Sequence, residues 1–327
     1  MENPVIQLNG VSKRYDDFMA VNDLNLSINK GEIFGLLGPN GAGKSTTILM
    51  LMGLTEPSSG KVEVCGINAT VKPIEVKRKV GYLPEDVGFY DDRTGLENLI
   101  YTAQLNGIRY QEAKQKAEEL LARVGLANDK NKKTGKYSKG MRQRLGLADV
   151  LIKNPEVIIL DEPTSGIDPT GVQELLSLIV ELRNERDITV LFSSHNLHQV
   201  QQVCDRVGIF VKGKLLCEGN IESLSEKLFT HGKYLIELGI EAKSQANKDA
   251  IAVEALQKVL SSVEDIQSIR KEKDYFQIEC STDNSSAIAK AVIDANYNLH
   301  FLNKKEYGLD AIYNRYFEGG ANDETSP

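Results

Sequence analysis

Residues 38–45 of the chain read Gly-Pro-Asn-Gly-Ala-Gly-Lys-Ser, a G-x-x-x-x-G-K-S loop. The loop lies between an expected strand at residues 33–37 and a helix that is expected to begin near Ser45. Its glycines let backbone N–H groups turn inward around phosphate oxygens, and the helix N-terminus adds positive dipole character. Lys44 would reach the β- and γ-phosphates of a nucleotide, and the Ser45 hydroxyl would ligate Mg²⁺. The loop therefore predicts a nucleoside triphosphate site.

Two adjacent acids form the second motif. Residues 157–160 are apolar at consecutive positions, as expected of a parallel strand buried on both faces, and Asp161 and Glu162 follow them. In open α/β sheets ligands bind at this carboxyl edge. Asp161 would hold Mg²⁺ directly or through water, and Glu162 would polarise the water that attacks the γ-phosphate. An ordinary strand could also end in two acids, but the phosphate loop favours the catalytic interpretation.

Further motifs narrow the class of nucleotide-binding protein. They are Tyr-Ser-Lys-Gly-Met-Arg-Gln at residues 137–143, Ser-Gly-Ile-Asp at residues 165–168, and His195 after an expected strand at residues 189–193. In this order, the motifs within residues 3–220 resemble the nucleotide-binding subunit of an ABC transporter. The resemblance covers about two thirds of the chain.

The resemblance implies an α/β fold: a P-loop ATPase domain of ABC type at residues 1–220, with a RecA-like core, an antiparallel β subdomain and a helical subdomain at about residues 86–153. It implies an ATPase that uses ATP and Mg²⁺ and couples hydrolysis to transmembrane transport. The expected phosphate contacts are Gly38, Asn40, Gly41, Gly43, Lys44, Ser45 and Thr46. The expected metal ligands are Ser45, Asp161 and Glu85.

The same resemblance assigns roles to five more residues. Tyr15 matches the aromatic residue that stacks on adenine, although an aromatic residue at this place could also belong to the core. Ser138 and Gly140 match the loop that contacts the γ-phosphate held by the other protomer, although Ser138 could simply cap a helix. Asp168 resembles the loop that communicates between the two sites, and His195 resembles the histidine that contacts the γ-phosphate.

Two departures from the family pattern concern the phosphate end of the site. The usual glutamine loop reads Tyr-Leu-Pro-Glu at residues 82–85, so that Glu85 puts a carboxylate where the family has an amide. This charge would strengthen metal coordination or repel the nucleotide. The usual Leu-Ser-Gly-Gly-Gln signature reads Tyr-Ser-Lys-Gly-Met at residues 137–141, which keeps Ser138 and Gly140. Such variants resemble the branch whose exporters have ABC-2-type membrane subunits.

The resemblance also implies partners. Two copies of the chain would sandwich two ATP molecules between the phosphate loop of one and the Ser138 loop of the other. Closure would drive a separate permease subunit, through a surface expected near residues 85–101. No stretch reaches the roughly 18 apolar residues that a spanning helix needs. The chain is thus expected to be cytoplasmic and peripheral at the inner face of the cell membrane, bound there through its permease.

Composition limits the alternatives. The net charge of −7 lacks the basic field of a nucleic-acid binder, so no nucleic-acid partner is expected. A soluble ABC ATPase with a non-transport role in translation or DNA repair is the main alternative. It is disfavoured because the chain has one phosphate loop and a short separation between Lys44 and Asp161. A catalytically dead module is disfavoured because Lys44, Asp161 and Glu162 are all present.

Residues 221–318 are expected to form an accessory α+β domain, followed by a flexible tail at residues 319–327. Strand and helix patterns alternate as β-α-β-β-α-β, which predicts a ferredoxin-like unit. Its expected strands lie at residues 234–240, 266–270, 275–280 and 299–303, and its helices at residues 249–260 and 285–295, with a closing helix at residues 309–317. We expect this domain to hold two subunits together; a passive domain that only stabilises its own subunit is the alternative.

Overall fold

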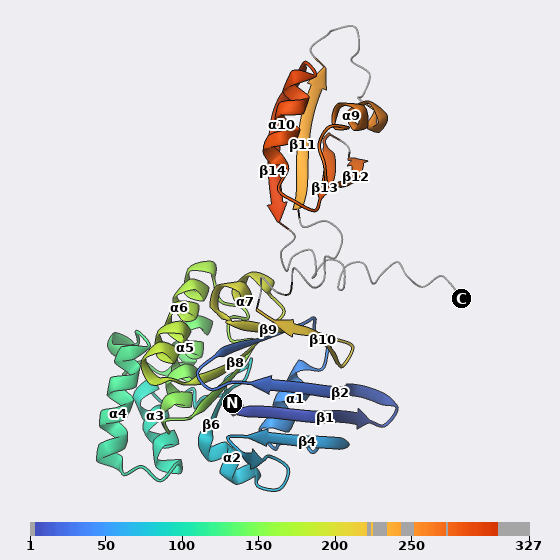
Figure 1. Ribbon diagram of the computed structural model, residues 1–327. Coiled ribbons are helices and arrows are strands. Elements are labelled where there is room, and N and C mark those ends of the chain that lie inside the picture. The colour runs from blue at the N-terminus through green and yellow to red at the C-terminus, as the bar shows by residue number, and fades with distance from the viewer. Residues whose placement is uncertain (1–3, 221–223, 225–233, 243–251, 273, 307–327) are drawn as a thin grey trace. The chain divides into compact units, whose positions relative to one another are not determined.

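The computed structural model describes residues 4–220, 224, 234–242, 252–272 and 274–306 of the chain. The chain divides into two compact units, Met1–Asn220 and Ile221–Pro327 (Figure 1). Each unit has an apolar cluster of its own among its described residues. Each therefore has the buried apolar surface that a separate folding unit requires.

The first unit contains a six-stranded sheet in the order β10-β9-β3-β8-β7-β6. Its strands are β3 (Ile33–Leu37), β6 (Val80–Leu83), β7 (Val157–Asp161), β8 (Thr189–Ser194), β9 (Arg206–Val211) and β10 (Lys214–Gly219). β9, β3, β8, β7 and β6 run parallel, and β10 pairs antiparallel with β9. β3 and β7 are buried along their whole length, which explains their uninterrupted apolar sequences. This sheet confirms the expected RecA-like core.

An antiparallel sheet in the order β2-β1-β4-β5 forms a second layer of the first unit (Figure 1). Its strands are β1 (Ile6–Tyr15), β2 (Phe18–Ile28), β4 (Ser59–Val64) and β5 (Ile67–Asn68). One apolar cluster joins this sheet to the six-stranded sheet and to the helix that follows the phosphate loop; it includes Leu8, Leu24, Phe34, Ile48 and Leu191. The expected antiparallel β subdomain is confirmed.

The helices of the first unit are α1 (Lys44–Leu51), α2 (Pro73–Lys79), α3 (Gly95–Leu105), α4 (Tyr110–Arg123), α5 (Lys139–Leu151), α6 (Pro169–Arg186) and α7 (Leu197–Val203). α3, α4 and α5 pack on one another and form the helical part at one end of the unit (Figure 1). α4 buries one stripe of residues, as the helical spacing of its apolar residues predicts. The stripe consists of Ala113, Ala117, Leu120 and Leu121. The expected helical subdomain is confirmed.

Several elements differ from the sequence-based expectation. Short β-type runs at residues 5–8 and 24–28 predict strands there, whereas β1 and β2 continue through mostly polar, partly exposed positions into a hairpin. Cross-strand pairing continues here with few buried side chains, among them Val11 and Val21, so the outer part shows no regular apolar pattern. The helices α2, α6 and α7 were also not predicted. α2 and α7 have seven residues each, and helices this short depend on tertiary packing.

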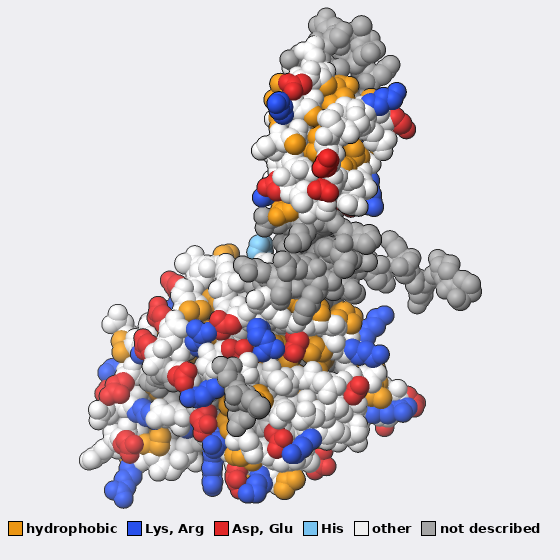
Figure 2. Space-filling model, viewed as in Figure 1, with side chains coloured by type: hydrophobic (Ala, Val, Ile, Leu, Met, Phe, Trp, Pro, Cys, Tyr) orange, Lys and Arg blue, Asp and Glu red, His pale blue; other side chains and the backbone are white. Residues whose placement is uncertain are grey.

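The surface of the first unit is mixed in charge. On the face shown in Figure 2, the described Lys and Arg side chains are interspersed with Asp and Glu side chains. That face therefore lacks the continuous basic area typical of nucleic-acid binders. A membrane-spanning segment, which needs both length and apolar character, is not found among the described helices.

The second unit forms a four-stranded antiparallel sheet in the order β12-β13-β11-β14. Its elements are β11 (Tyr234–Ala242), α9 (Val253–Val259), β12 (Ile266–Lys271), β13 (Phe276–Cys280), α10 (Ser285–Asp294) and β14 (Tyr297–Glu306). Alternate residues of β11 and β13, among them Ile236, Leu238 and Ile278, are fully buried with Leu256 and Ile288 of the helices. The expected ferredoxin-like order is confirmed. The helix expected at residues 309–317 and the tail lie outside the described residues.

Gly53 ends the helix that follows the phosphate loop. Its φ is +59°, and a Cβ there would lie 2.5 Å from the Ala69 carbonyl oxygen and 2.6 Å from Pro73 Cβ. We expect Gly53→Ala to lower the free energy of unfolding, because it adds a clash of about 1–3 kcal/mol to the strain of a left-handed backbone. Urea unfolding of the full chain measures this loss.

Gly66 supplies the matched control, because its φ is +71° but a Cβ would meet nothing within 4 Å. Gly66→Ala should therefore cost only the left-handed strain of about 1 kcal/mol. Equal losses in the two variants would show that the backbone contact at Ala69 does not constrain the end of this helix.

Candidate functional site

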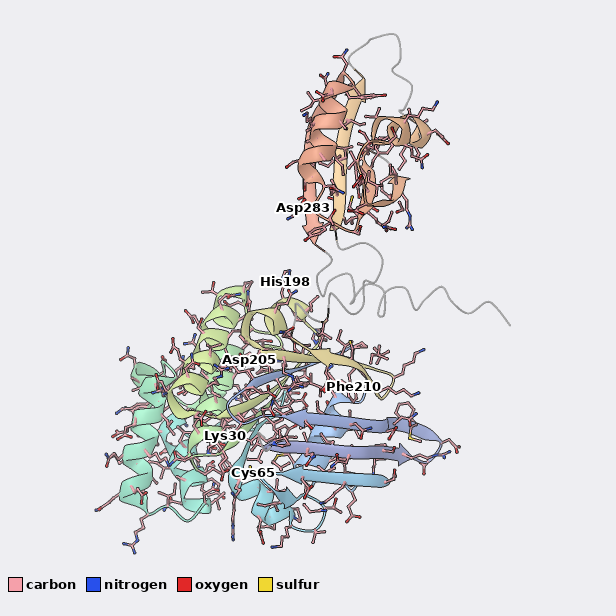
Figure 3. The ribbon with its side chains drawn as sticks, viewed as in Figure 1. Lys30, Cys65, His198, Asp205, Phe210 and Asp283 are labelled. Atoms are coloured by element: carbon pink, nitrogen blue, oxygen red, sulfur yellow. The ribbon has the colours of Figure 1, made fainter. Side chains whose placement is uncertain are left out.

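The phosphate loop lies between β3 and α1 and is shaped by its glycines. Gly41 and Gly43 have φ values of +79° and +104°, which favour residues without a Cβ. A Cβ on Gly38 would lie 2.4 Å from the carbonyl oxygen of Phe210, which is on β9 (Figure 3). Gly43 precedes α1 and brings no side chain to cap it, so the first N–H groups of the helix can face an anion. The loop therefore has the geometry of a phosphate cradle.

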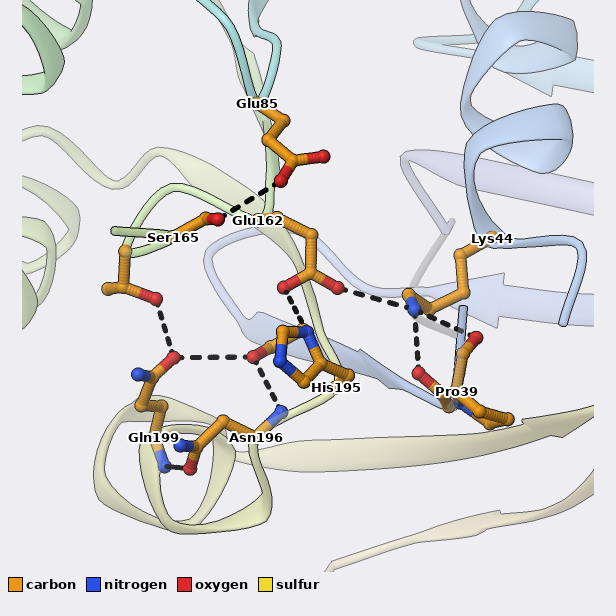
Figure 4. A network of polar contacts seen from close by, with 11 residues as sticks. Pro39, Lys44, Glu85, Glu162, Ser165, His195, Asn196 and Gln199 are labelled. Atoms are coloured by element: carbon orange, nitrogen blue, oxygen red, sulfur yellow. Dashed lines mark hydrogen bonds and ion pairs between the residues drawn. The ribbon is translucent and has the colours of Figure 1, made fainter. Parts of the chain in front are cut away.

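Lys44 is folded back into this loop. Its side chain is 5% exposed, and its Nζ donates hydrogen bonds to the carbonyl oxygens of Gly38, at 2.6 Å, and Pro39, at 3.2 Å. The same Nζ lies 3.3 Å from Oε1 of Glu162 (Figure 4). The ammonium group is thus held at the mouth of the loop by groups that phosphate oxygens could replace.

Asp161 ends β7 and is buried beside the loop. Burial raises the pKa of Asp161, and the hydroxyl groups of Ser193 and Ser45 oppose this rise. Its Oδ1 has no hydrogen-bond partner among the described residues. A buried carboxylate oxygen without a donor is costly, and a divalent cation would compensate it. Asp161 and the neighbouring Ser45 hydroxyl therefore fit a hard cation such as Mg²⁺.

Glu162 contacts both Lys44 of the phosphate loop and the end of β8. It is buried and has a φ of +49°, which is uncommon for a residue with a side chain and costs about 1 kcal/mol or more. Its backbone N–H donates to the Ser193 carbonyl oxygen at 3.0 Å. Its Oε2 lies 2.9 Å from Nδ1 of His195, while its Oε1 faces Lys44 (Figure 4). One carboxylate thus bridges Lys44, at the start of α1, and His195, directly after β8.

Glu85 follows β6 and is exposed. Ser165 Oγ donates a hydrogen bond of 3.0 Å to its Oε1 (Figure 4). Gln143 Nε2 donates to its backbone oxygen at 2.9 Å. Among the described contacts, its carboxylate meets Ser165 and neither Ser45 nor Asp161. A metal-binding role for Glu85 stays a prediction.

Ser138, Gly140 and Asp168 lie at the N-termini of two helices, away from the Lys44 contacts. Ser138 caps α5 by accepting a 3.2 Å hydrogen bond from the Met141 N–H, and Gly140 is in the first turn. Asp168 caps α6 by accepting from the Gly171 N–H at 3.0 Å. The capping function considered for Ser138 is therefore present, and its hydroxyl hydrogen can still be donated to a phosphate. Ser138 and Asp168 are exposed, so a second copy could reach them.

Tyr15 ends β1 at the tip of the β1–β2 hairpin. Its side chain is 44% exposed, so the alternative that it belongs to the core is wrong. Lys13 Nζ lies 4.8 Å from the centre of its ring. An exposed ring of this kind can stack on a planar base.

The sequence analysis missed a small polar cluster behind the histidine. Gln199 Oε1 accepts hydrogen bonds from Thr164 Oγ1, at 2.6 Å, and Ser194 Oγ, at 3.3 Å. Ser194 Oγ also accepts from the Asn196 N–H at 3.0 Å (Figure 4). These contacts fix the residues on both sides of His195. A signal was present, since Ser194 is a polar residue at the end of buried β8 and Thr164 is a polar residue shortly after buried β7.

Known proteins resemble the chain in sequence. The family model described as ABC transporter matches residues 21–165. The bacitracin transport ATP-binding protein BcrA of Bacillus licheniformis is 43% identical over 231 residues, which cover 71% of this chain and 74% of that protein. The uncharacterised ABC transporter ATP-binding protein YcbN of Bacillus subtilis is 32% identical over 317 residues, which cover 97% of this chain and 98% of that protein.

A solved structure resembles the first unit. It is the dimeric structure of a post-hydrolysis state of the ATP-binding cassette MJ0796 bound to ADP and Pi, with 25% identity and a TM-score of 0.61. The match covers 66% of this chain and 98% of that one. These findings confirm the expected fold class and the expected ATPase activity, and they favour transport over the non-transport alternative. The chain therefore belongs to the family of ABC transporter ATP-binding proteins, which are ATPases coupled to transport.

Proposed function

We propose that two copies of this chain close on two ATP molecules and drive an exporter whose membrane subunit is of the ABC-2 type. The observation that carries the catalytic part is the position of Glu162, whose carboxylate lies between Lys44 and His195. Phosphate oxygens that enter the loop would take over the Lys44 ammonium group. Glu162 would then be released to accept a proton from the attacking water, and His195 would orient the Glu162 carboxylate.

Phosphate release by the full chain tests this function. Wild type should release phosphate from ATP, and Lys44→Ala should not, because the variant loses the cation that binds the phosphates. Equal rates in the two proteins would exclude hydrolysis at this loop.

Glu162→Gln should trap a closed dimer. The amide cannot accept the proton of the attacking water, so we expect hydrolysis to slow at least a hundredfold, within the usual range for loss of a general base. ATP contacts both copies in the proposed sandwich, so unhydrolysed ATP should keep them together. Size-exclusion chromatography with ATP should give a dimer for this variant.

The matched control is Glu119→Gln, an exposed glutamate on α4. It should hydrolyse ATP as the wild type does and should show no trapped dimer. A Glu162→Gln protein that stays monomeric with ATP would argue against the sandwich.

Mg²⁺ would supply a positive charge that neutralises the phosphates, held by Ser45 and Asp161. Burial raises the pKa of Asp161, so the folded chain binds this proton more tightly than the unfolded chain does. The buried charge therefore destabilises the metal-free fold above the usual aspartate pKa of 3.8. When a cation compensates the Asp161 carboxylate, the negative charge stabilises the fold instead of destabilising it.

Asp161→Asn should consequently raise the free energy of unfolding of the metal-free chain at pH 7, and this gain should vanish as the pH falls towards 3.8. Stabilisation by ATP with Mg²⁺ should be much smaller for the variant than for the wild type. Urea unfolding with and without Mg²⁺-ATP measures both effects. A variant that Mg²⁺-ATP stabilises as strongly as the wild type would remove Asp161 from the metal site.

The membrane partner is the second part of the proposal. The relative BcrA is named for bacitracin transport, which supports an exporter of antibiotic-like compounds for this chain as well. The chain would lie at the cytoplasmic face of the membrane and contact the permease through residues 85–101. This segment joins the carboxyl edge of the sheet, through Glu85, to the helical part at α3.

We further assign residues 1–220 to the ATPase domain, residues 221–318 to an accessory domain and residues 319–327 to a tail. The accessory domain would pack on its twin and raise the local concentration of the second subunit. A chain that ends at Asn220 should therefore hydrolyse ATP more slowly per subunit at low protein concentration and should recover at high concentration. A concentration series of ATPase rates for both lengths measures this. Equal rates at low concentration would leave the accessory domain a passive role.

A further inference from the structure

The side chain of Gln199, on α7, joins the two turns that carry Glu162 and His195. Its Oε1 accepts a 2.6 Å hydrogen bond from Thr164 Oγ1 and a 3.3 Å hydrogen bond from Ser194 Oγ (Figure 4). Thr164 lies two residues after Glu162, and Ser194 lies directly before His195. One amide oxygen therefore connects the turn after β7 to the turn after β8.

The turn after β7 has a backbone conformation that needs support. Glu162 has a φ of +49°, and a residue with a side chain keeps such a conformation only where its surroundings determine it. Within the turn, the Ser165 N–H donates to the Glu162 carbonyl oxygen at 3.1 Å. The buried Thr164 adds a hydrogen bond that leaves the turn and ends on Gln199. This hydrogen bond is thus one of the contacts that hold Glu162 in its conformation.

The turn after β8 is held by the same side chain. Ser194 is fully buried, and its Oγ accepts from the Asn196 N–H at 3.0 Å while it donates to Gln199. The Asn196 side chain accepts from the Gln199 N–H at 3.3 Å and so caps α7. The residues on both sides of His195 are therefore fixed. Because the His195 side chain is 51% exposed, its direction towards Glu162 depends on this fixed backbone.

The distance between the Glu162 carboxylate and the His195 ring is 2.9 Å, and the proposed hydrolysis depends on it. A misplacement of about 1 Å in a catalytic site can cost about a hundredfold in rate. An amide does not exchange protons near neutral pH, so Gln199 cannot take over the role of either residue. Any contribution of Gln199 to the reaction is therefore geometric.

We propose that Gln199 is a positioning residue for ATP hydrolysis, which fixes Glu162 and His195 relative to each other through the hydroxyl groups of Thr164 and Ser194. The inference rests on the proposed function and adds a residue to its catalytic step. The phosphate loop belongs to β3 and α1, so phosphate binding by Lys44 should not depend on Gln199.

Steady-state phosphate release by the full chain, measured over a range of ATP concentrations, tests the proposal. Gln199→Leu has a side chain of similar size that cannot accept a hydrogen bond. We expect its kcat to fall at least tenfold, because both turns lose their common partner, and its KM for ATP to stay within twofold of the wild type. A kcat within twofold of the wild type would overturn the inference.

The matched control is Gln202→Leu on the same helix. Gln202 is exposed, and its Oε1 accepts from Gln173 Nε2 at 3.3 Å, away from both turns. This variant should keep the wild-type kcat and KM. An equal fall of kcat in Gln199→Leu and Gln202→Leu would show that any loss of a glutamine from α7 slows the reaction, and it would contradict the specific role of Gln199.

Two conservative variants separate positioning from a general effect on the fold. Gln199→Glu keeps an oxygen that can accept from both hydroxyl groups, so it should retain a kcat within threefold of the wild type. Gln199→Asn keeps the amide but is one methylene group shorter, so it should be as slow as Gln199→Leu. If Gln199→Asn is as fast as the wild type, the reach of the side chain does not matter and the proposal fails.

A double variant tests whether Gln199 acts through Thr164. Thr164→Val removes the hydroxyl group and keeps the shape of the side chain. In a Gln199→Leu background it should slow hydrolysis by less than twofold further, because the link between the turns is already lost. Losses that multiply would show that the two residues act independently and would overturn the inference.

Urea unfolding and ATP titration complete the test. A raised KM in Gln199→Leu, or a chain that is partly unfolded under assay conditions, would assign Gln199 a structural role and overturn the inference. Such results would leave the proposed function intact as long as the wild type hydrolyses ATP and Lys44→Ala does not. If the wild type does not hydrolyse ATP, the proposed function fails and the inference fails with it.

Discussion

The parallel pairing of β3, β8 and β7 is the constraint on which the whole site depends. In this register Leu37 lies beside Ser194, and Asp161 lies beside Ser193, so three strands end at one edge. The loop after β3, the acids after β7 and the histidine after β8 consequently meet, although they are far apart in the sequence. A shift of one residue in either pairing would turn side chains to the opposite face and separate these groups.

Lys44 and Glu162 compensate each other's charge at this edge without a ligand. Lys44 is buried with a carboxylate and two carbonyl oxygens, and Glu162 is buried with a lysine and a histidine. A nucleotide would not enter an empty cavity but would exchange these internal partners for its phosphates. In the proposed mechanism, phosphate binding and the release of Glu162 are thus parts of one event, because the same Lys44 ammonium group serves both.

Sequence patterns predicted the elements whose burial is regular. β3 and the apolar run of β7 were recognised because both of their faces are covered. The sequence of α4 is recognisable as a helix because it buries a single stripe. α6 could also have been predicted, since an Asp-Pro start and an apolar period are present in its sequence. The contact of Glu85 with Ser165 could not, because it depends on how distant segments pack. The metal role of Glu85 remains a prediction for the same reason.

The phosphate loop is in contact with β9, because Gly38 lies close to the backbone of Phe210. The backbone of β9 lies against the loop, and β9 continues through an antiparallel hairpin into β10, which ends at Gly219. Outward displacement of the loop would have to push this hairpin, because backbone atoms in contact cannot yield as side chains do. The hairpin is also the last described ladder before the second unit begins at Ile221. The segment that leads to the second unit therefore begins directly after a hairpin whose first strand is in contact with the phosphate loop.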